Sequence, residues 1–283
     1  MEIISDFDQM RRLAQDWRTQ GQRIALVPTM GYFHDGHLSL MRYGREAADR
    51  VVVSLFVNPT QFGPNEDLAR YPRDLERDAA LAREVGVDAL YTPQMEAMYP
   101  PGFQTLVTVE DLSRPLCGAS RPGHFRGVAT VVLKLLLQVH PHLAVFGEKD
   151  YQQLQVISRL NDDLELGVEI VGMPTIREAD GLAMSSRNSY LSTEERQRAL
   201  AISKGLFAAR DAAKGGEAEV SKLVATVRAE LVRVQAREDY VELVDAKSLA
   251  PLTRLQKGVP ARALVAAFVG TTRLIDNLAI ELG

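Results

Sequence analysis

Two histidines stand three residues apart, directly after the first apolar segment of the chain. That segment, RIALVPTMG at residues 23–31, is followed by His34, Gly36 and His37, and a helical pattern begins with the next residues. Imidazole N–H groups can donate hydrogen bonds to phosphoryl oxygens, and the free N–H groups at a helix start favour an anion. The glycine allows the backbone to approach such a ligand closely. The pattern favours phosphate binding, although surface or helix-capping histidines share it.

A second polar segment lies far along the chain, at Met184, Ser185, Ser186 and Arg187. Two hydroxyl groups and a guanidinium group match the oxygens of a polyphosphate. By itself the segment is typical of a solvated loop. An HxGH segment after the first strand combined with an M-S-S segment after the last one, however, resembles the signature of the nucleotidyltransferase superfamily, whose members transfer AMP from ATP.

A third segment, FGEKD at residues 146–150, again ends a predicted strand and begins a predicted helix. Lys149 would bring a compact positive charge to an α-phosphate, and Asp150 could accept hydrogen bonds from ribose hydroxyls. Gly147 would allow close contact between the backbone and an adenosine. Taken alone, a Lys-Asp cap at a helix start is the simpler explanation.

The elements that carry these segments alternate between helix and strand. Helical spacing of apolar residues predicts helices, and short Val-rich runs predict buried strands. The predicted helices cover 7–17, 35–48, 72–85, 127–139 and 151–164, and the predicted strands cover 23–31, 51–59, 88–93, 143–150 and 168–176. Such alternation indicates an α/β, Rossmann-like parallel sheet with helices on both faces. Ligands bind at the carboxyl ends of strands in sheets of this kind, where the histidine and lysine segments fall.

The pattern changes after about residue 177. Two Ala-rich helical stretches run from 193 to 237, and three strand candidates follow at 240–246, 261–269 and 272–280. We therefore expect a nucleotide-binding domain over residues 1–176 and a smaller C-terminal α+β domain over residues 177–283, which closes over the active site. The stretch GLAMSSRNSYLS at 181–192 suits a loop facing a cleft between them.

Composition narrows the class of protein. The 283 residues are 46% hydrophobic, and 33 basic against 37 acidic residues give a formal net charge of -4. That balance offers no excess positive charge for nucleic acid. We expect no membrane span, because no apolar stretch approaches the roughly 20 residues that a bilayer requires. The single cysteine, Cys117, cannot form an internal disulfide, which fits a reducing cytoplasm. It lies in a loop-like stretch and has no acid-base partner that the sequence identifies.

Six segments, in order, resemble the pantothenate synthetase family: PTMGYFHDGH, LFVNPTQF, DLARYPRD, RPGHFRGV, FGEKDYQQL and DGLAMSSRNSYLS. Farther on, VELVDA and RLIDN are similar to the smaller domain of that family. The resemblance implies a ligase that condenses (R)-pantoate with β-alanine. ATP would first adenylate pantoate, releasing pyrophosphate, and the amine would then displace AMP. Magnesium and a homodimer are implied as well.

The resemblance also assigns roles to residues. Catalysis would fall to His37, His34 and Lys149. The implied ATP-binding residues are Met30, Gly31, Tyr32, Phe33, His34, Asp35, Gly36, His37, Gly147, Glu148, Lys149, Asp150, Ile176, Met184, Ser185, Ser186 and Arg187. Gln61 and Gln153 would bind pantoate, with Gln61 also facing the amine. Asn58 would be a lesser contributor, or equally a residue of the turn that ends its strand. No protein residue is implied as a metal ligand.

Two other classes of function stay open on the sequence. Another HxGH nucleotidyltransferase could transfer AMP to a phosphate-bearing acceptor, although the NPTQF and RPGHF segments argue against it. A nucleotide-binding sensor or an RNA-binding module could use the same fold, because fold does not determine function. A sensor would bind ATP without turnover, and the acidic balance disfavours RNA.

Overall fold

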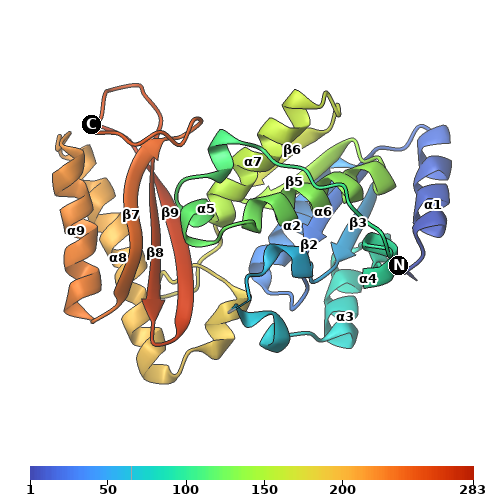
Figure 1. The fold of residues 1–283 in the computed structure, drawn as a ribbon, viewed down its shortest axis with the longest axis horizontal. Coiled ribbons are helices and arrows are strands. Elements are labelled where there is room, and N and C mark those ends of the chain that lie inside the picture. Colours follow the sequence, from blue (N-terminus) through green and yellow to red (C-terminus); the bar gives the residue numbers. More distant parts are fainter. Residues whose placement is uncertain (65) are drawn as a thin grey trace. The chain divides into compact units, whose positions relative to one another are not determined.

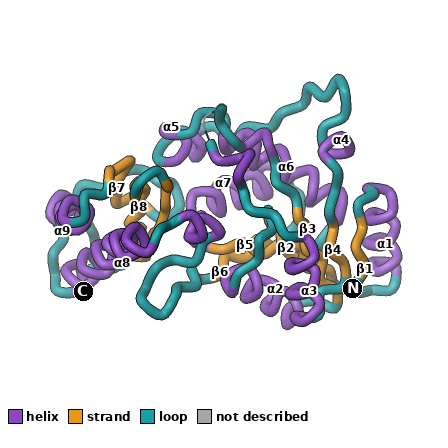
Figure 2. The backbone as a smooth tube through the Cα atoms, turned by 90° about the horizontal axis from the view of Figure 1, so that it is seen from below, coloured by secondary structure: helices purple, strands orange, loops and turns teal. Residues whose placement is uncertain are grey.

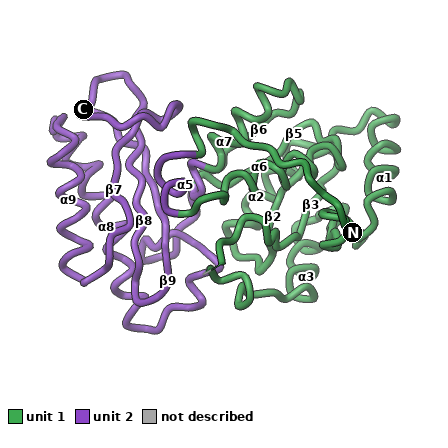
Figure 3. Tube along the Cα trace, viewed as in Figure 1, with its two compact units in different colours: residues 1–113, 121–148, 153–174 green, residues 114–120, 149–152, 175–283 purple. Residues whose placement is uncertain are grey.

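The computed structural model describes residues 1–64 and 66–283 (Figure 1). Its contacts divide these residues into two compact units (Figure 3). Unit 1 comprises residues 1–113, 121–148 and 153–174, and unit 2 comprises residues 114–120, 149–152 and 175–283. The predicted domains 1–176 and 177–283 stay a prediction, since compact units defined by contacts are not folding domains.

Unit 1 contains a six-stranded parallel sheet with the order β1-β4-β3-β2-β5-β6. The strands are β1 (Glu2–Ile4), β2 (Ile24–Thr29), β3 (Arg50–Leu55), β4 (Ala89–Tyr91), β5 (Leu143–Gly147) and β6 (Glu169–Met173). The central strands are almost continuously apolar because helices cover both of their faces. This confirms the predicted α/β class.

Helices pack on the two faces of this sheet (Figure 2). On one face lie α2 (Asp35–Ala47) and α3 (Leu75–Val85), and on the other lies α6 (His124–Val139), against which α1 (Phe7–Thr19) packs. The remaining helices of this region are α4 (Met95–Met98) and α7 (Tyr151–Asp163), whose first two residues belong to unit 2.

The strand order reverses between β2 and β5, which are neighbours in the sheet. From β2 the chain continues through β3 and β4 on one side, whereas β5 and β6 lie on the other side. Parallel sheets bind ligands outside the carboxyl ends of the strands at such a switch point. The segment that contains His34 and His37 follows the carboxyl end of β2, and Glu148 follows the carboxyl end of β5, at this same edge of the sheet.

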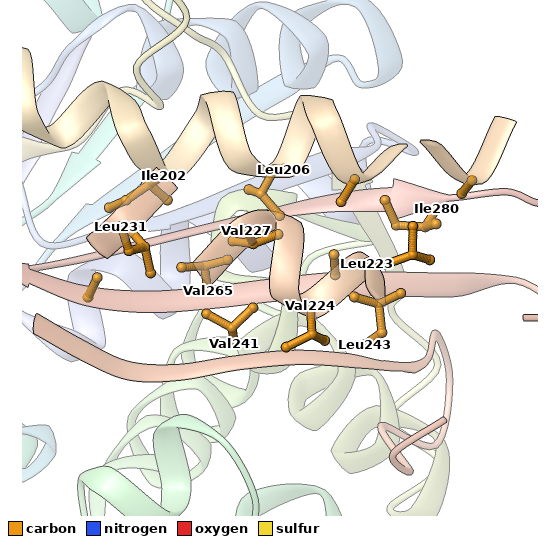
Figure 4. Packing of buried hydrophobic residues seen from close by; sticks show 14 of the residues in the cluster. Ile202, Leu206, Leu223, Val224, Val227, Leu231, Val241, Leu243, Val265 and Ile280 are labelled. Atoms are coloured by element: carbon orange, nitrogen blue, oxygen red, sulfur yellow. The ribbon is translucent and has the colours of Figure 1, made fainter. Parts of the chain in front are cut away.

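Unit 2 contains the antiparallel sheet β7-β8-β9, formed by Arg237–Asp245, Ala261–Val269 and Thr272–Ile280. The helices α8 (Thr193–Lys214) and α9 (Val220–Arg233) cover one face of it. Figure 4 shows Leu206, Val227 and Val265 within the core between helices and sheet. The short helix α5 (Cys117–Ser120) belongs to the same unit.

Three local features differ from the sequence-based expectation. Strand β1 was not predicted, because only Ile4 of its three residues is buried and no alternation marks it. Helix α3 begins at Leu75 and not at Pro72, since the Asp74 carboxylate caps it by accepting from the Arg77 N–H at 3.1 Å. Helix α6 begins three residues earlier than predicted, at His124.

Cys117 was expected in a loop-like stretch, which is wrong, and the sequence identified no acid-base partner for it. The residue begins α5 and is 6% exposed. Its Sγ lies 3.1 Å from the Tyr240 hydroxyl and 3.5 Å from Arg273 Nη2. Burial and the neighbouring thiol raise the pKa of Tyr240 well above its usual value. The partners come from β7 and β9, more than a hundred residues away along the chain, and local sequence carries no sign of them.

None of the helices in the described part of the chain combines the length and the apolar character that a bilayer-spanning helix requires.

The close approach of α6 to the segment after β3 yields a stability prediction. A Cβ on Gly127 would lie 2.5 Å from the Thr60 carbonyl oxygen and 2.7 Å from the Gln61 nitrogen. We expect Gly127→Ala to lower the free energy of unfolding by about 1–3 kcal/mol, because backbone atoms must move apart. Urea denaturation measures this change.

Gly44→Ala is the matched control, since Gly44 lies within helix α2 and its Cβ would meet Ala25 Cβ of strand β2 at 3.4 Å, an ordinary contact. Alanine is the better helix former by about 0.5–1 kcal/mol, so this variant should be as stable as the parent or more so. Equal stability of the two variants would contradict the close-approach argument.

Candidate active site

The turn after β2 is held by one buried carboxylate. Gly31 and Tyr32 both adopt left-handed conformations, with φ of 85° and 54°. Asp78 from α3, which is 1% exposed, accepts hydrogen bonds from the N–H groups of Tyr32 at 2.6 Å and Phe33 at 2.7 Å. Arg77 donates to the Phe33 carbonyl at 2.8 Å. Helix α3 thereby fixes the turn that leads into α2.

Burial raises the pKa of Asp78, and the hydrogen bonds from Phe33 and Tyr32 oppose that effect. Both carboxylate oxygens face backbone donors, so the buried group is satisfied where it lies. These two N–H groups of the predicted ATP-binding segment consequently serve the turn.

The two histidines form a reciprocal cap at the start of α2. His34 is the N-cap residue, and its Nδ1 accepts from the Gly36 N–H at 3.1 Å. The Nδ1 of His37 accepts from the His34 N–H at 3.4 Å, and the ring centroids lie 4.1 Å apart. An Nδ1 that accepts a hydrogen bond places the proton of a neutral imidazole on Nε2. Each ring can therefore cap the helix and present an Nε2–H donor.

Gln61 ends a 3-10 turn, Pro59–Gln61, and is only 8% exposed. Its Oε1 accepts from Asn58 Nδ2 at 3.2 Å, and its Nε2 lies 3.2 Å from the sulfur of Met30. The structure thus brings Gln61 together with Met30, the first residue of the predicted ATP-binding segment at 30–37. The second predicted pantoate residue, Gln153, lies partly exposed in the first turn of α7.

Asn58 is almost fully buried and held on both sides of its amide. Its Nδ2 also donates to the Gly127 carbonyl at 3.2 Å. Its Oδ1 accepts from the Tyr99 hydroxyl at 2.8 Å and from the Thr60 hydroxyl at 2.9 Å. With both ends of the amide engaged by protein, Asn58 orients Gln61. Tyr99 carries no motif that could have identified it from the sequence.

Two residues of the RPGHF segment form hydrogen bonds with the backbone of Gln61. His124 Nδ1 lies 2.8 Å from the Gln61 carbonyl oxygen and donates to it, and Arg121 Nη2 donates to the same oxygen at 3.3 Å. Arg121 also forms a two-point ion pair with Glu66, at 2.6 and 2.7 Å. Burial would raise the pKa of Glu66, but the hydrogen bond and the charge of Arg121 outweigh burial and lower it.

Unit 2 contains residues 184–187, here called the serine-arginine segment, at the end of a small hairpin. The Met184 N–H donates to the Ile176 carbonyl at 3.0 Å, and Arg177 pairs with Ala183. Ser185 caps the 3-10 helix η5 (Ser186–Tyr190). The hairpin therefore joins the predicted adenine contact, Ile176, to the predicted phosphate-binding segment.

Lys149 and Asp150 also belong to unit 2, whereas Gly147 and Glu148 belong to unit 1. Lys149 Nζ lies 4.0 Å from Asp150 Oδ1, and the Lys149 side chain is 18% exposed. Among residues 1–64 and 66–283, no group of three or more His, Cys, Asp or Glu side chains could hold a metal ion.

Sequence reasoning missed the residues that act at a distance. Asp78 follows the quoted DLARYPRD segment by four positions, yet only its buried helical position within RDAALA could have singled it out. Arg121 and His124 stood in a recognised motif without an assigned role, and their contacts with Gln61 now provide one.

Comparison with known proteins covers the whole fold. The pantothenate synthetase of Myxococcus xanthus is 64% identical over 269 residues, which cover 93% of this chain and 92% of that protein. The pantothenate synthetase of Thermus thermophilus superposes with a TM-score of 0.92 at 48% identity, covering 98% of this chain and 99% of the other.

A pantoate–β-alanine ligase from Francisella tularensis, solved as a complex with "Beta-gamma ATP and Beta-alanine", matches with a TM-score of 0.81 at 34% identity, over 98% of this chain and 97% of that chain. The family model for pantoate–β-alanine ligase matches residues 2–279. With a match from one end to the other, this chain belongs to the pantoate–β-alanine ligase family.

Proposed function

We propose that the protein joins pantoate to β-alanine, with conversion of ATP to AMP and pyrophosphate through a pantoyl adenylate. The observation that carries the proposal is the family match over residues 2–279. The complex of the Francisella tularensis ligase with an ATP compound and β-alanine supports the same pair of substrates. The histidine cap at the switch point of the parallel sheet supplies the expected chemistry.

The first step is attack by the pantoate carboxylate on the α-phosphorus of ATP. The Nε2–H groups of His34 and His37 donate to phosphate oxygens and stabilise the charge that develops on pyrophosphate. Lys149 neutralises charge at the α-phosphate, and Ser185, Ser186 and Arg187 bind the departing group. The neutral histidine donors belong to unit 1, and Lys149 and Arg187 belong to unit 2. The rest of the segment from Met30 to His37 lines the ATP phosphates, and Met184 folds over the triphosphate with the serine and arginine residues that follow it. Gly147, Glu148 and Asp150 hold the nucleotide, and Ile176 contacts the adenine through its backbone.

Gln61 and Gln153 bind pantoate. Because the Oε1 of Gln61 accepts from Asn58, the end of Gln61 that faces pantoate is Nε2, through the N–H that is not directed at the Met30 sulfur. A donor of this kind recognises a carboxylate or hydroxyl oxygen without adding a charge that would hold the acid too tightly in its ground state. Asn58 serves as a positioning residue for this amide. Contact between Gln61 and the amine of β-alanine stays a prediction.

Magnesium enters as part of the substrate, MgATP. Mg²⁺ is commonly held by substrate phosphates with few protein carboxylates. In the second step the free amine of β-alanine attacks the acyl carbon and releases AMP. Exclusion of water by the smaller domain protects the adenylate until then. A homodimer and a cytoplasmic location complete the proposal, and sedimentation of the purified protein tests the former.

Pyrophosphate exchange tests the order of these events. With magnesium, ATP and pantoate but without β-alanine, labelled pyrophosphate should exchange into ATP, because adenylation precedes and does not require the amine. Addition of β-alanine should then yield equal amounts of AMP and pantothenate. Exchange that requires a phosphate-bearing acceptor in place of pantoate would favour another nucleotidyltransferase, and ATP binding without exchange or turnover would favour a sensor.

Replacement of His37 by alanine should reduce the rate of this exchange by about 10²- to 10³-fold, because one preorganised donor to developing charge contributes that much. The control is His140→Asn, since His140 ends α6 in a left-handed conformation that asparagine tolerates. The control should keep parental exchange. A folded His37→Ala variant with near-parental exchange would remove His37 from the site.

Tyr99→Phe should raise the KM for pantoate by about 2- to 10-fold while the KM for ATP stays constant, because one hydrogen bond that orients Asn58 and Gln61 is lost. Tyr91→Phe is the control. Tyr91 is a buried tyrosine of the same unit, and its hydroxyl donates to Gln138 Oε1 at 3.0 Å. Steady-state kinetics with each substrate varied in turn measures the difference, and equal shifts in both variants would argue against the orienting role.

A further inference from the structure

Strand β9 contains two adjacent polar residues that are nearly fully buried. Asp276 is 4% exposed and Asn277 is 2% exposed, within the RLIDN segment. Neighbouring residues on a strand project from opposite faces of a sheet. Asp276 pairs with Val265, a residue of the core beneath the helices, so Asp276 projects to the helix side and Asn277 to the other side.

Asp276 holds the base of the hairpin that carries the serine-arginine segment. Its carboxylate forms a two-point ion pair with Arg177, with Nη1–Oδ2 at 2.6 Å and Nη2–Oδ1 at 2.9 Å. Arg177 also donates to the Gly181 carbonyl at 3.1 Å within the hairpin. A planar two-point pair fixes direction as well as distance. The hairpin is thereby oriented on β9 seven residues before Met184.

Asn277 holds the backbone of Lys149 on the opposite side of the sheet. Its Nδ2 donates to the Lys149 carbonyl at 2.9 Å, and its Oδ1 accepts from Arg262 Nε at 2.7 Å. Arginine has no acceptor, so this contact fixes which end of the amide faces Lys149. The Arg262 guanidinium lies 4.1 Å from the ring centroid of Tyr151, which follows Lys149 by two residues.

A further hydrogen bond links the contact between Asp276 and Arg177 to the contact between Asn277 and Lys149. The Asn277 N–H donates to Asp276 Oδ1 at 2.7 Å, so the carboxylate that holds Arg177 also contacts the residue that holds Lys149. A buried ion pair adds little net stability, because desolvation offsets much of its attraction. Its geometric constraint is the larger contribution here.

We propose that Asp276 and Asn277 are positioning residues for catalysis, holding the serine-arginine hairpin and Lys149 in a fixed arrangement on β9. The inference rests on the proposed function, because that function assigns ATP to both segments. The proposal assigns neither residue a contact with a substrate. Asp276 acts through Arg177, and Asn277 acts through the backbone of Lys149.

Two isosteric variants separate the effect of Asn277 on Lys149 from the effect of Asp276 on the hairpin, which are called the lysine arm and the hairpin arm. Asn277→Asp keeps the acceptor for Arg262 but sets a carboxylate oxygen against the Lys149 carbonyl, so the kcat of pantoate-dependent pyrophosphate exchange should fall about tenfold with little change in ATP affinity. Asp276→Asn breaks the two-point pair, so the dissociation constant for ATP, measured by calorimetry without pantoate, should rise about tenfold.

Asp239→Asn is the matched control. Asp239 on β7 forms a comparable ion pair with Arg273 on β9, at 2.7 and 3.0 Å, but this pair contacts Cys117 and lies outside both nucleotide segments. The control should lose thermal stability to a similar degree and keep parental ATP affinity and kcat.

Coupling provides the decisive measurement. In the Asn277→Asp background, Lys149→Ala should cost less exchange activity than in the parent, because the lysine is already displaced. Additive losses, or three variants that lower only the melting temperature, would overturn the inference. Absence of pantoate-dependent exchange in the parent would instead reject the proposed function, and the ATP affinity of Asp276→Asn would still test the hairpin arm.

Discussion

The paired hydrogen bonds from Tyr32 and Phe33 to Asp78 are the constraint on which the histidine segment depends. A left-handed conformation costs a non-glycine residue about 1–2 kcal/mol, and Tyr32 adopts one. A buried carboxylate without donors would be costlier still. The two backbone N–H groups satisfy the buried carboxylate of Asp78, and their hydrogen bonds hold Tyr32 in its left-handed conformation. The chain therefore turns from β2 into α2 with His34 at the N-cap.

Capping of α2 is compatible with the ligand-binding role proposed for the same two histidine rings. Because each Nδ1 serves the helix start, the orientation and the tautomer of both histidines are fixed before any nucleotide arrives. Preorganisation of this kind reduces the reorganisation required when charge develops on a phosphate. The backbone of Lys149, by contrast, is held by Asn277 of the C-terminal sheet, although Lys149 follows strand β5 of the parallel sheet in the sequence.

The sequence predicted the parallel sheet, its covering helices and the antiparallel strands well, because apolar periodicity and helix caps are local signals. The HxGH, GEKD and MSSR motifs were recognisable because each is a short run of neighbouring residues. Asp78 could not be assigned, since its partners lie 45 and 46 residues earlier in the chain. The contact of Arg121 with Gln61 and that of Cys117 with Tyr240 likewise arise only when distant segments pack together.

The fixed direction of the Gln61 amide has a consequence for inhibitor design. Tyr99 and Thr60 hold the oxygen of Asn58, and Asn58 in turn holds the oxygen of Gln61. Gln61 Nε2 donates one N–H to the Met30 sulfur, so the group that it offers to a ligand under the proposed function is its second N–H. A compound that presents another donor to this N–H leaves both groups unsatisfied, which costs more than the absence of a contact. Isosteres that exchange an acceptor for a donor should therefore be rejected by polarity, even where their shape fits.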